Sequence, residues 1–481
     1  MKYLIVLISI LVILTFLAPA VNASVTPTTK TPIKHVINIF FENHTFDNFF
    51  GIYPENPPGN NSSLNLNISV PLNLLSNSSL LSKLSQIPPG TFSTADPIEG
   101  YLPYHEDWNY GLMNEFAAGS GKQSMTYFTA SQVSPLWDLA EQYSIADNYF
   151  APQISESAPN TLYYLAGFSP VFNDYGPPPN IPINETIFGE MNNYHISWGV
   201  YVNGTSKNFD MSQYISGINN YSSNINSWGN FTQELSNGTL PSVSYVFSQD
   251  ANGYDMGAPS NILKGELWLL MLINSIETSP IWNSTAVFIT WDDPGGYYDQ
   301  VSPPVFDGVQ LGMRLPLIVV SPYAKENYVS NTLMTHSSIL SFIDYNWNMP
   351  ALNHFVSSLP LPLDMFNFNV PYANGMIARG PIRFNNFPLP DSLEFTLNSS
   401  QLQFNYSSQF PVTPQIEFSS LPYERNGSYS INLSNLNAGI YVRSDYSVTP
   451  FAYSPYAVVL FLLIDAILLF VLLRRQKNGR R

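Results

Sequence analysis

The sequence contains no cysteine and few charged residues, which make up 11% of its 481 positions. Without cysteine, disulfide-stapled folds, zinc fingers, iron–sulfur clusters and cysteine nucleophiles are excluded. The charged share is less than half of the about 25% that is usual in globular proteins. Hydrophobic residues account for 45% of the chain and aromatic residues for 14%, too much apolar side chain for a disordered protein. The length allows one large core and a smaller module.

Positive charge is the scarcer sign. The chain has 18 lysine and arginine residues against 34 aspartate and glutamate residues, and its formal net charge is −16. Five of the basic residues lie in the last eight positions, so the rest of the chain is even more acidic relative to its size. An acidic body repels the phosphates of nucleic acids, and we therefore expect no nucleic-acid partner.

Both ends of the chain carry apolar segments. Residues 1–23 combine Lys2, an apolar stretch and small residues before position 24, which predicts a cleaved secretory signal; an uncleaved anchor is the alternative. Residues 456–473 are apolar except for Asp465 and are long enough to span a bilayer. The basic tail at 474–481 (RRQKNGRR) would then lie in the cytoplasm. The sequence thus predicts a single-pass protein of the cell membrane with its main domain outside.

An extracellular main domain agrees with the many glycosylation sequons. About fifteen Asn-X-Ser/Thr triplets occur, among them those at Asn203, Asn237, Asn283 and Asn426. A chain rich in asparagine and serine also produces such triplets by chance. The prediction of a glycoprotein therefore rests mainly on the predicted topology.

The middle of the chain has the pattern of an α/β domain. Strand-like runs occur at 33–41, 196–202, 242–247, 286–291 and 315–320, and helical patterns at 135–143 and 262–277. Alternating strands and helices predict a largely parallel sheet covered by helices. From about residue 391 apolar and polar residues alternate with a period of two, which predicts a small β-rich module. We therefore expect a catalytic domain at 24–390 and a β-rich juxtamembrane module at 391–450.

Two strand-like runs end in groups of oxygen-bearing side chains. Glu42 and Asn43 follow the first run, and Asp292 and Asp293 follow the run at 286–291. In an open α/β sheet, ligands bind beyond the carboxyl ends of strands, so both pairs can reach one pocket. Such donors suit Mg²⁺, Ca²⁺ or Mn²⁺. Either pair alone could instead serve a turn or a helix cap, and Asn43 also lies in a sequon.

A third segment, ISESAPNTLYYLAG at 154–167, places Ser157 before a proline-fixed turn. A helix that starts there would expose the hydroxyl next to free backbone N–H groups, which favour an anion. A helix N-cap is the structural alternative for this serine.

Taken in order, several segments resemble one family. ENHTFDNFFGIYP (42–54) opens the resemblance, followed by His105 within PYHEDWNYGLMNEF and by SIADNYF before SESAPNTLYYLAG. It continues at TAVFITWDDPGGYYDQVSPP, GMRLPLIVVSPYAK and THSSILSFIDYNW, and covers roughly residues 33–370. These motifs are similar to those of the phosphoesterase family that contains bacterial phospholipases C and AcpA-type acid phosphatases.

The resemblance implies an alkaline-phosphatase-like three-layer α/β/α fold and hydrolysis of phosphate esters or phospholipids. It implies that Ser157 is the nucleophile and passes through a phosphoserine, with a divalent metal ion nearby. The residues that match the family's metal ligands are Glu42, Asn43, Asp292 and Asp293. Those that match histidines around its phosphate are His105 and His336.

Several positions depart from the family pattern. His44 stands where the family usually has arginine, and Pro294 and Gly257 stand where it has histidine. Fewer basic groups would reduce the positive charge at the site. A surface or adhesion protein that keeps the fold without turnover is therefore the competing interpretation. Convergence of Ser157 with the four oxygen-bearing residues would favour the enzyme.

Overall fold

The structure is a computed structural model that describes residues 28–54, 74, 77–203, 209–248 and 253–369, together with the backbone of short strands between 383 and 441. The predicted signal peptide (1–23), membrane helix (456–473) and basic tail (474–481) lie outside the described residues. Within the part that is described, no helix is both long and apolar enough to cross a membrane.

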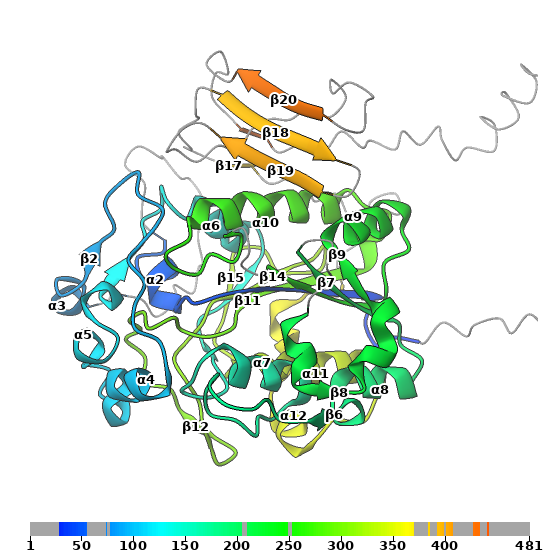
Figure 1. The fold of residues 1–481 in the computed structure, drawn as a ribbon, viewed down its shortest axis with the longest axis horizontal. Coiled ribbons are helices and arrows are strands. Elements are labelled where there is room, and N and C mark those ends of the chain that lie inside the picture. Colours follow the sequence, from blue (N-terminus) through cyan, green and yellow to red (C-terminus); the bar gives the residue numbers. More distant parts are fainter. Residues whose placement is uncertain are drawn as a thin grey trace, which may run out of the picture.

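The centre of the molecule is an eight-stranded sheet (Figure 1). Its first strand in sequence, β1, lies in the interior of the sheet between β10 and β11. The order across the sheet is β15 (Tyr328–Ser330), β4 (Ser144–Ala146), β14 (Leu317–Val320), β11 (Thr285–Trp291), β1 (His35–Phe41), β10 (Val243–Phe247), β7 (Trp198–Val202) and β9 (Ile225–Ser227).

The sheet is largely parallel, as predicted, but it is mixed because one strand, β14, runs the other way. Pairings from β11 through β1, β10 and β7 to β9 are parallel, as expected, whereas β14 runs antiparallel to both β11 and β4. The direction of β14 follows from the segment that connects it to β11. No crossover helix separates β11 from β14, so the chain leaves at the carboxyl end of β11 and returns from that same edge.

Helices cover both faces of the sheet, which confirms the predicted α/β class (Figure 1). One layer holds α6, α9 and α10, and the opposite layer holds α7, α8, α11 and α12. Their bounds are α6 (Ser134–Gln142), α7 (Ser157–Ala166), α8 (Ile187–Asn193), α9 (Trp228–Asn237), α10 (Ile262–Glu277), α11 (His336–Asn346) and α12 (His354–Ser358).

Shorter elements surround these layers. The helices are α2 (Phe46–Phe50), α3 (Ser78–Leu81), α4 (Tyr101–Trp108) and α5 (Phe116–Gly119). The strands are β2 (Ser85–Gln86), β3 (Thr126–Tyr127), β5 (Tyr149–Phe150), β6 (Ile181–Pro182), β8 (Ile215–Ser216), β12 (Val305–Phe306), β13 (Val309–Gln310) and β16 (Met334–Thr335).

Strands also occur where the sequence predicts a β-rich module. Strand β18 (Ser392–Asn398) pairs antiparallel with β19 (Gln401–Tyr406) and β20 (Gly427–Asn432). The short strands β17 (Arg383–Phe384) and β21 (Ile440–Tyr441) pair with each other. The boundary of this module at 391 stays a prediction.

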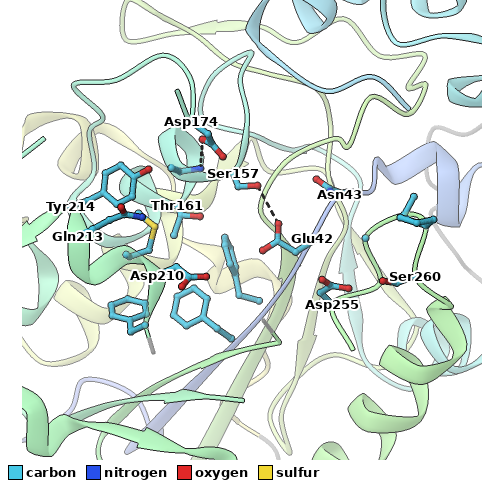
Figure 2. A pocket seen from close by; sticks show the side chains of 18 residues that line it. Glu42, Asn43, Ser157, Thr161, Asp174, Asp210, Gln213, Tyr214, Asp255 and Ser260 are labelled. Atoms are coloured by element: carbon cyan, nitrogen blue, oxygen red, sulfur yellow. Dashed lines mark hydrogen bonds between the residues drawn. The ribbon is translucent and has the colours of Figure 1, made fainter. Parts of the chain in front are cut away.

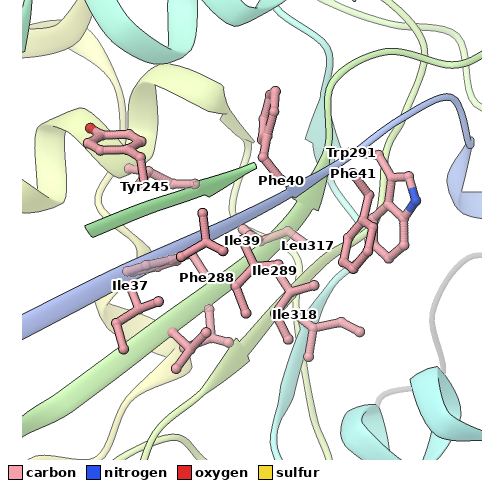
Figure 3. Packing of buried hydrophobic residues seen from close by; sticks show 14 of the residues in the cluster. Ile37, Ile39, Phe40, Phe41, Tyr245, Phe288, Ile289, Trp291, Leu317 and Ile318 are labelled. Atoms are coloured by element: carbon pink, nitrogen blue, oxygen red, sulfur yellow. The ribbon is translucent and has the colours of Figure 1, made fainter. Parts of the chain in front are cut away.

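Strand β1 is buried from both sides, which explains its continuous apolar sequence. Phe40 stacks on Tyr164 of α7, with ring centroids 4.4 Å apart, on one face of the sheet. On the other face Phe41 packs against Trp268 of α10 at 5.5 Å and against Trp291 at 5.3 Å. Figure 3 shows Phe40, Phe41 and Trp291 among the apolar side chains packed along β1 and its neighbours. This rigid interior strand ends at Glu42, so its packing fixes where the candidate site begins.

Candidate functional site

Two neighbouring parallel strands deliver the four oxygen-bearing residues. Phe41 of β1 is in register with Trp291 of β11, so Glu42 and Asp292 leave the sheet at the same edge. The backbone N–H of Asn43 then donates to Oδ1 of Asp292 at 3.0 Å. The two pairs therefore meet at the carboxyl ends of the strands, where open α/β sheets bind ligands.

Ser157 lies against these carboxylates. Its Oγ is 3.2 Å from Oε2 of Glu42 and 3.3 Å from Oδ2 of Asp293, within hydrogen-bond reach of both. Helix α7 begins at Ser157, its N-cap is Glu156, and no side chain caps it. The helix-cap interpretation of Ser157 is therefore wrong, because its hydroxyl points to the carboxylates and not to the backbone of α7.

The turn before α7 is held by its own asparagine. Asn160 accepts from the N–H of Gln153 at 3.0 Å and donates to the carbonyl of Ser155 at 2.8 Å. Oδ1 of Asp174 accepts from the N–H of Ala158 at 2.9 Å, so a carboxylate already occupies part of the helix N-terminus. The SESAPN sequence thus fixes the position of Ser157 through local bonds.

The carboxylates carry an unbalanced negative charge. Burial, followed by the negative charge of Asp292 and a hydrogen bond with its carboxyl group, raises the pKa of Glu42 well above its usual range. Burial and the charge of Asp292 likewise raise the pKa of Asp293. Crowded carboxyl groups of this kind need either protons or a cation.

The carboxylate and amide oxygens of these four residues are of the type that binds hard divalent cations. Oδ1 of Asn43 and Oδ2 of Asp292 are buried and find no hydrogen-bond donor. In the described part of the chain, no set of three or more acidic or histidine side chains is already arranged as a metal site. The other carboxylate oxygens accept hydrogen bonds from Ser157 and from backbone amides. The residues therefore fit such an ion by their chemistry, and binding would require them to exchange these partners.

Asn43 is not placed to carry a glycan. Its amide nitrogen donates to Oε1 of Glu99 at 2.9 Å, and its Oδ1 is buried. Attachment of a sugar would break the first contact and crowd the second. These two contacts argue against a glycan on Asn43.

The two predicted histidines lie in different environments. His336 is buried, with Nε2 2.8 Å from the backbone oxygen of Asp292 and Nδ1 2.6 Å from the hydroxyl of Tyr149. Burial lowers the pKa of His336 to about 3, so its ring is neutral and donates to Asp292. His105 is partly exposed on α4, and its Nδ1 bonds to the carbonyl of Tyr101. His336 thus orients the Asp292 segment, whereas no described contact joins His105 to Ser157.

The departures from the family pattern have local structural consequences. His44 lies between Phe49 and Tyr297, and its two nitrogens face Oδ1 of Asn48 and the carbonyl of Met256. Burial lowers the pKa of His44 to about 4, so both bonds form together only in acidic solution. A Cβ on Gly257 would lie 3.2 Å from Cβ of Glu42. A larger residue at position 257 would therefore press on the strand end that carries Glu42.

A cavity of about 440 Å³ opens beside Ser157 (Figure 2). Four carboxyl groups line it, those of Glu42, Asp174, Asp210 and Asp255. Aromatic and apolar side chains make up much of the remaining wall. No lysine, arginine or histidine is among the described residues that line the cavity. The described lining of the cavity therefore offers no side-chain positive charge to a phosphate ester.

Some residues of the site have no signal in the sequence analysis. Tyr104 of α4 donates to Oδ1 of Asp293 at 3.4 Å, directly beside the predicted His105. Asp174 and Asp255 come from segments with no strand ending. Burial, followed by the charge of Glu156, raises the pKa of Asp174 to about 6. Only the position of Tyr104 within the PYHEDW motif could have suggested it.

A buried ion-pair cluster ties the two ligand-bearing loops together. Arg314 donates to Oδ1 of Asp47 at 2.9 Å and to Oδ2 of Asp299 at 3.1 Å, and all three side chains are fully buried. Asp47 follows the Glu42 segment and Asp299 follows the Asp293 segment. The guanidinium group thus joins the loops that leave β1 and β11.

Replacing Arg314 with methionine should destabilise the fold by about 3–5 kcal/mol, because it leaves two buried carboxylates without a cation. Urea unfolding at neutral pH measures the loss. A change below about 1 kcal/mol would show that Asp47 and Asp299 do not depend on this guanidinium.

Comparison with known proteins places most of the described chain in one family. Residues 33–350 match the model of the phosphoesterase family. The non-hemolytic phospholipase C of Burkholderia pseudomallei is 24% identical over 69% of this chain, and the match spans 57% of that relative. Phospholipase C A of Mycobacterium tuberculosis is 23% identical over 73% of this chain and 80% of its own length. Non-specific phospholipase C6 of Arabidopsis thaliana is 22% identical over 67% and 69%, respectively.

The similarity of this chain to solved structures is low. A protein in the alkaline phosphatase superfamily from Vibrio parahaemolyticus covers 60% of this chain with a TM-score of 0.32 and 11% identity. The family match rests on the sequence and extends over most of the described domain. It confirms the resemblance and agrees with the expected class of enzyme, a hydrolase of phosphoric esters. The chain therefore belongs to the phosphoesterase family.

Proposed function

We propose that this protein is a metal-dependent phosphoesterase that uses Ser157 as its nucleophile. The observation that carries the proposal is the position of the Ser157 hydroxyl, 3.2 Å and 3.3 Å from the carboxylates of Glu42 and Asp293. A solvated helix cap would have no reason to lie between two buried acids. The convergence favours an enzyme over a surface protein that only keeps the fold.

The residues of the chain divide the work as follows. The Ser157 oxygen attacks phosphorus while its proton passes to Glu42 or Asp293, and the bond to the leaving alcohol breaks. Water then hydrolyses the phosphoserine and frees Ser157. Asp174, whose pKa is raised to about 6, can supply the proton of the leaving alcohol in weakly acidic solution.

Glu42, Asn43, Asp292 and Asp293 would hold a divalent ion of the Mg²⁺, Ca²⁺ or Mn²⁺ type. Such an ion would supply the positive charge that the described lining of the cavity lacks. His336 positions the Asp292 segment through a hydrogen bond from its Nε2 to the backbone oxygen of Asp292. The assignment of an alkaline-phosphatase-like fold and of an extracellular, membrane-anchored location belongs to the same proposal.

The substrate class follows in part from the relatives, which are named phospholipases C. Turnover of p-nitrophenyl phosphate and of phosphatidylcholine by the full chain, with and without a chelator, tests the proposal. We expect activity on at least one of these esters that a chelator abolishes and a divalent ion restores. Equal turnover in the presence of chelator would overturn the metal dependence.

Asp292→Asn should weaken divalent-ion binding by about a hundredfold or more, since it removes the charge of a ligand and not only that of a supporting group. Isothermal titration with the metal ion alone measures the affinity without requiring turnover. Asp210→Asn is the matched control, because Asp210 lines the cavity but lies outside the ligand set. Equal weakening by both variants would place the ion elsewhere.

A further inference from the structure

Most of the exposed large hydrophobic side chains in the described chain come from two segments that contact each other through Tyr101 and Phe172. Among the described residues nine such side chains are exposed, and six of them come from segments 101–112 and 172–175. We call these six residues the apolar rim. They are Tyr101, Leu102, Tyr110, Leu112, Phe172 and Tyr175.

Aromatic contacts make part of the apolar rim continuous. Phe172 contacts Tyr101 with ring centroids 6.3 Å apart, and Tyr101 lies 4.0 Å from His105. His105 contacts Trp108 at 6.1 Å, and Trp108 contacts Tyr110 at 5.7 Å. Leu102, Tyr110 and Leu112 are 76%, 89% and 68% exposed, so the contacts within this strip leave them open to solvent.

The apolar rim adjoins the candidate active site. Tyr104 of α4, which carries part of the rim, donates to Asp293. Phe172 is two residues before Asp174, which lines the cavity, and its carbonyl accepts from the hydroxyl of Ser155. In Figure 1 α4 lies on the same side of the sheet as α7, which begins with Ser157. Segment 172–175 therefore reaches the cavity through Asp174, and α4 contacts the site through Tyr104, whereas the exposed side chains of the rim are not among the described residues that line the cavity.

The charge next to the apolar rim is negative. Three acids of segment 96–119, Asp96, Glu106 and Glu115, are exposed, and the segment has no lysine or arginine; the nearest exposed basic residue after it in the sequence is Lys122. Anionic lipids would be repelled by this segment, whereas zwitterionic headgroups present ammonium groups toward water. Tyrosines, with an apolar ring and a polar tip, suit the interface between headgroups and acyl chains.

We propose that the apolar rim docks on a zwitterionic lipid surface and holds the cavity beside its headgroups. Exposed apolar patches of this kind mark interaction sites, and the acidic flank selects this partner among lipid surfaces. The membrane helix predicted at 456–473 would keep the domain close to a bilayer. This proposal rests on the proposed function, because docking would serve to bring lipid esters to the Ser157 site.

A single labelled cysteine can report on docking, because the sequence has no cysteine of its own. The full chain is reconstituted in phosphatidylcholine vesicles with an environment-sensitive fluorophore on Leu112→Cys. Tyr194→Cys is the matched control, since Tyr194 is an exposed aromatic residue outside the rim. We expect quenching by spin-labelled phosphatidylcholine at position 112 and none at position 194.

A triple variant tests the consequence for activity. Leu102→Ser, Tyr110→Ser and Leu112→Ser together should raise the KM for phosphatidylcholine in mixed micelles by about tenfold to a hundredfold, since each change removes apolar contact area. Turnover of soluble p-nitrophenyl phosphate should be unchanged. Tyr194→Ser should alter neither.

Three results would overturn the docking proposal. The first is a label at position 112 that stays open to iodide and is not quenched by spin-labelled lipid. The second is equal quenching in vesicles rich in phosphatidylglycerol, which would remove the role of the acidic flank. The third is protection from iodide without quenching by lipid, together with a doubled mass, which would make the rim a contact between two copies. Quenching in a protein without turnover would instead refute only the proposed function.

Discussion

Replacing Ser157 with alanine is expected to lower kcat by about a thousandfold or more, with little change in Tm. The nucleophile is lost, and the remaining groups offer no covalent route to the product. The stability should change little because no described backbone group depends on this hydroxyl, which contacts only the carboxylates of Glu42 and Asp293. Steady-state kinetics and a thermal melt of the same preparation measure both quantities.

Two further variants sharpen this test. Ser157→Thr should keep part of the activity, because threonine supplies a hydroxyl at the same position. His336→Ala should lose less than Ser157→Ala, since His336 acts through the Asp292 backbone and is not in contact with Ser157. Capture of a phosphorylated peptide spanning 154–167 from the wild type would support the covalent route. Normal kcat in folded Ser157→Ala would end the proposed mechanism.

The second large effect concerns stability and pH, because the described core buries carboxyl groups without basic partners. Burial, followed by the charge of Glu190, raises the pKa of Asp344 to about 9, and burial raises that of Glu190 to about 7. Oδ1 of Asp344 and Oε2 of Glu190 have no donor, which a shared proton would supply. On the other face of the sheet both carboxyl oxygens of Glu266 are buried without a donor, near Asp138.

These groups should make the protein more stable in acid than at neutral pH. Below the usual carboxyl pKa of about 4, each group is protonated in the folded and unfolded states, and burial costs little. As pH rises toward 7–9, the unfolded chain releases these protons first, and the folded state loses stability relative to it. We expect Tm to fall steadily between pH 4 and pH 8.

Thermal melts with a chelator present measure this dependence without a contribution from a bound ion. Glu266→Gln keeps the shape of the side chain and removes its charge, so it should raise Tm at pH 8 and leave it nearly unchanged at pH 4. The gain at pH 8 should be of the order of a few kcal/mol, the usual cost of a buried carboxylate without a partner. A Tm that is highest near pH 8 would contradict the expected sign.

The sequence predicts the centre of this fold well because its strands are buried on both faces. Continuous apolar runs mark β1 and β11, and the polar residues at their ends must leave the core, which locates Glu42 and Asp292. Helix α10 begins and ends at the predicted residues, 262 and 277. The direction of β14 was not predictable from its apolar pattern, which is the same for parallel and antiparallel strands.

The wall of the cavity could not be predicted for a different reason. Asp174, Asp210 and Asp255 reach the site through contacts between segments far apart in sequence, and no local pattern records such contacts. The two predicted histidines also show that a sequence motif does not reveal the surroundings of a side chain. His105 and His336 both lie in family-like motifs, yet one faces solvent and the other lies beneath Asp292. The motif identifies the residue, while its partners come from the packing.

The central position of β1 determines when the middle of the sheet can form during synthesis. Its two neighbours, β10 and β11, start at residues 243 and 285, so the first strand to be synthesised waits for most of the domain. At ribosomal speeds of about 5–20 residues per second, this delay is roughly 10–40 seconds. Throughout that time the segment HVINIFF has no partner strand and is prone to aggregate. We therefore expect the risk of aggregation to be highest before β10 has been synthesised, and Glu42 can meet Asp292 only late in folding.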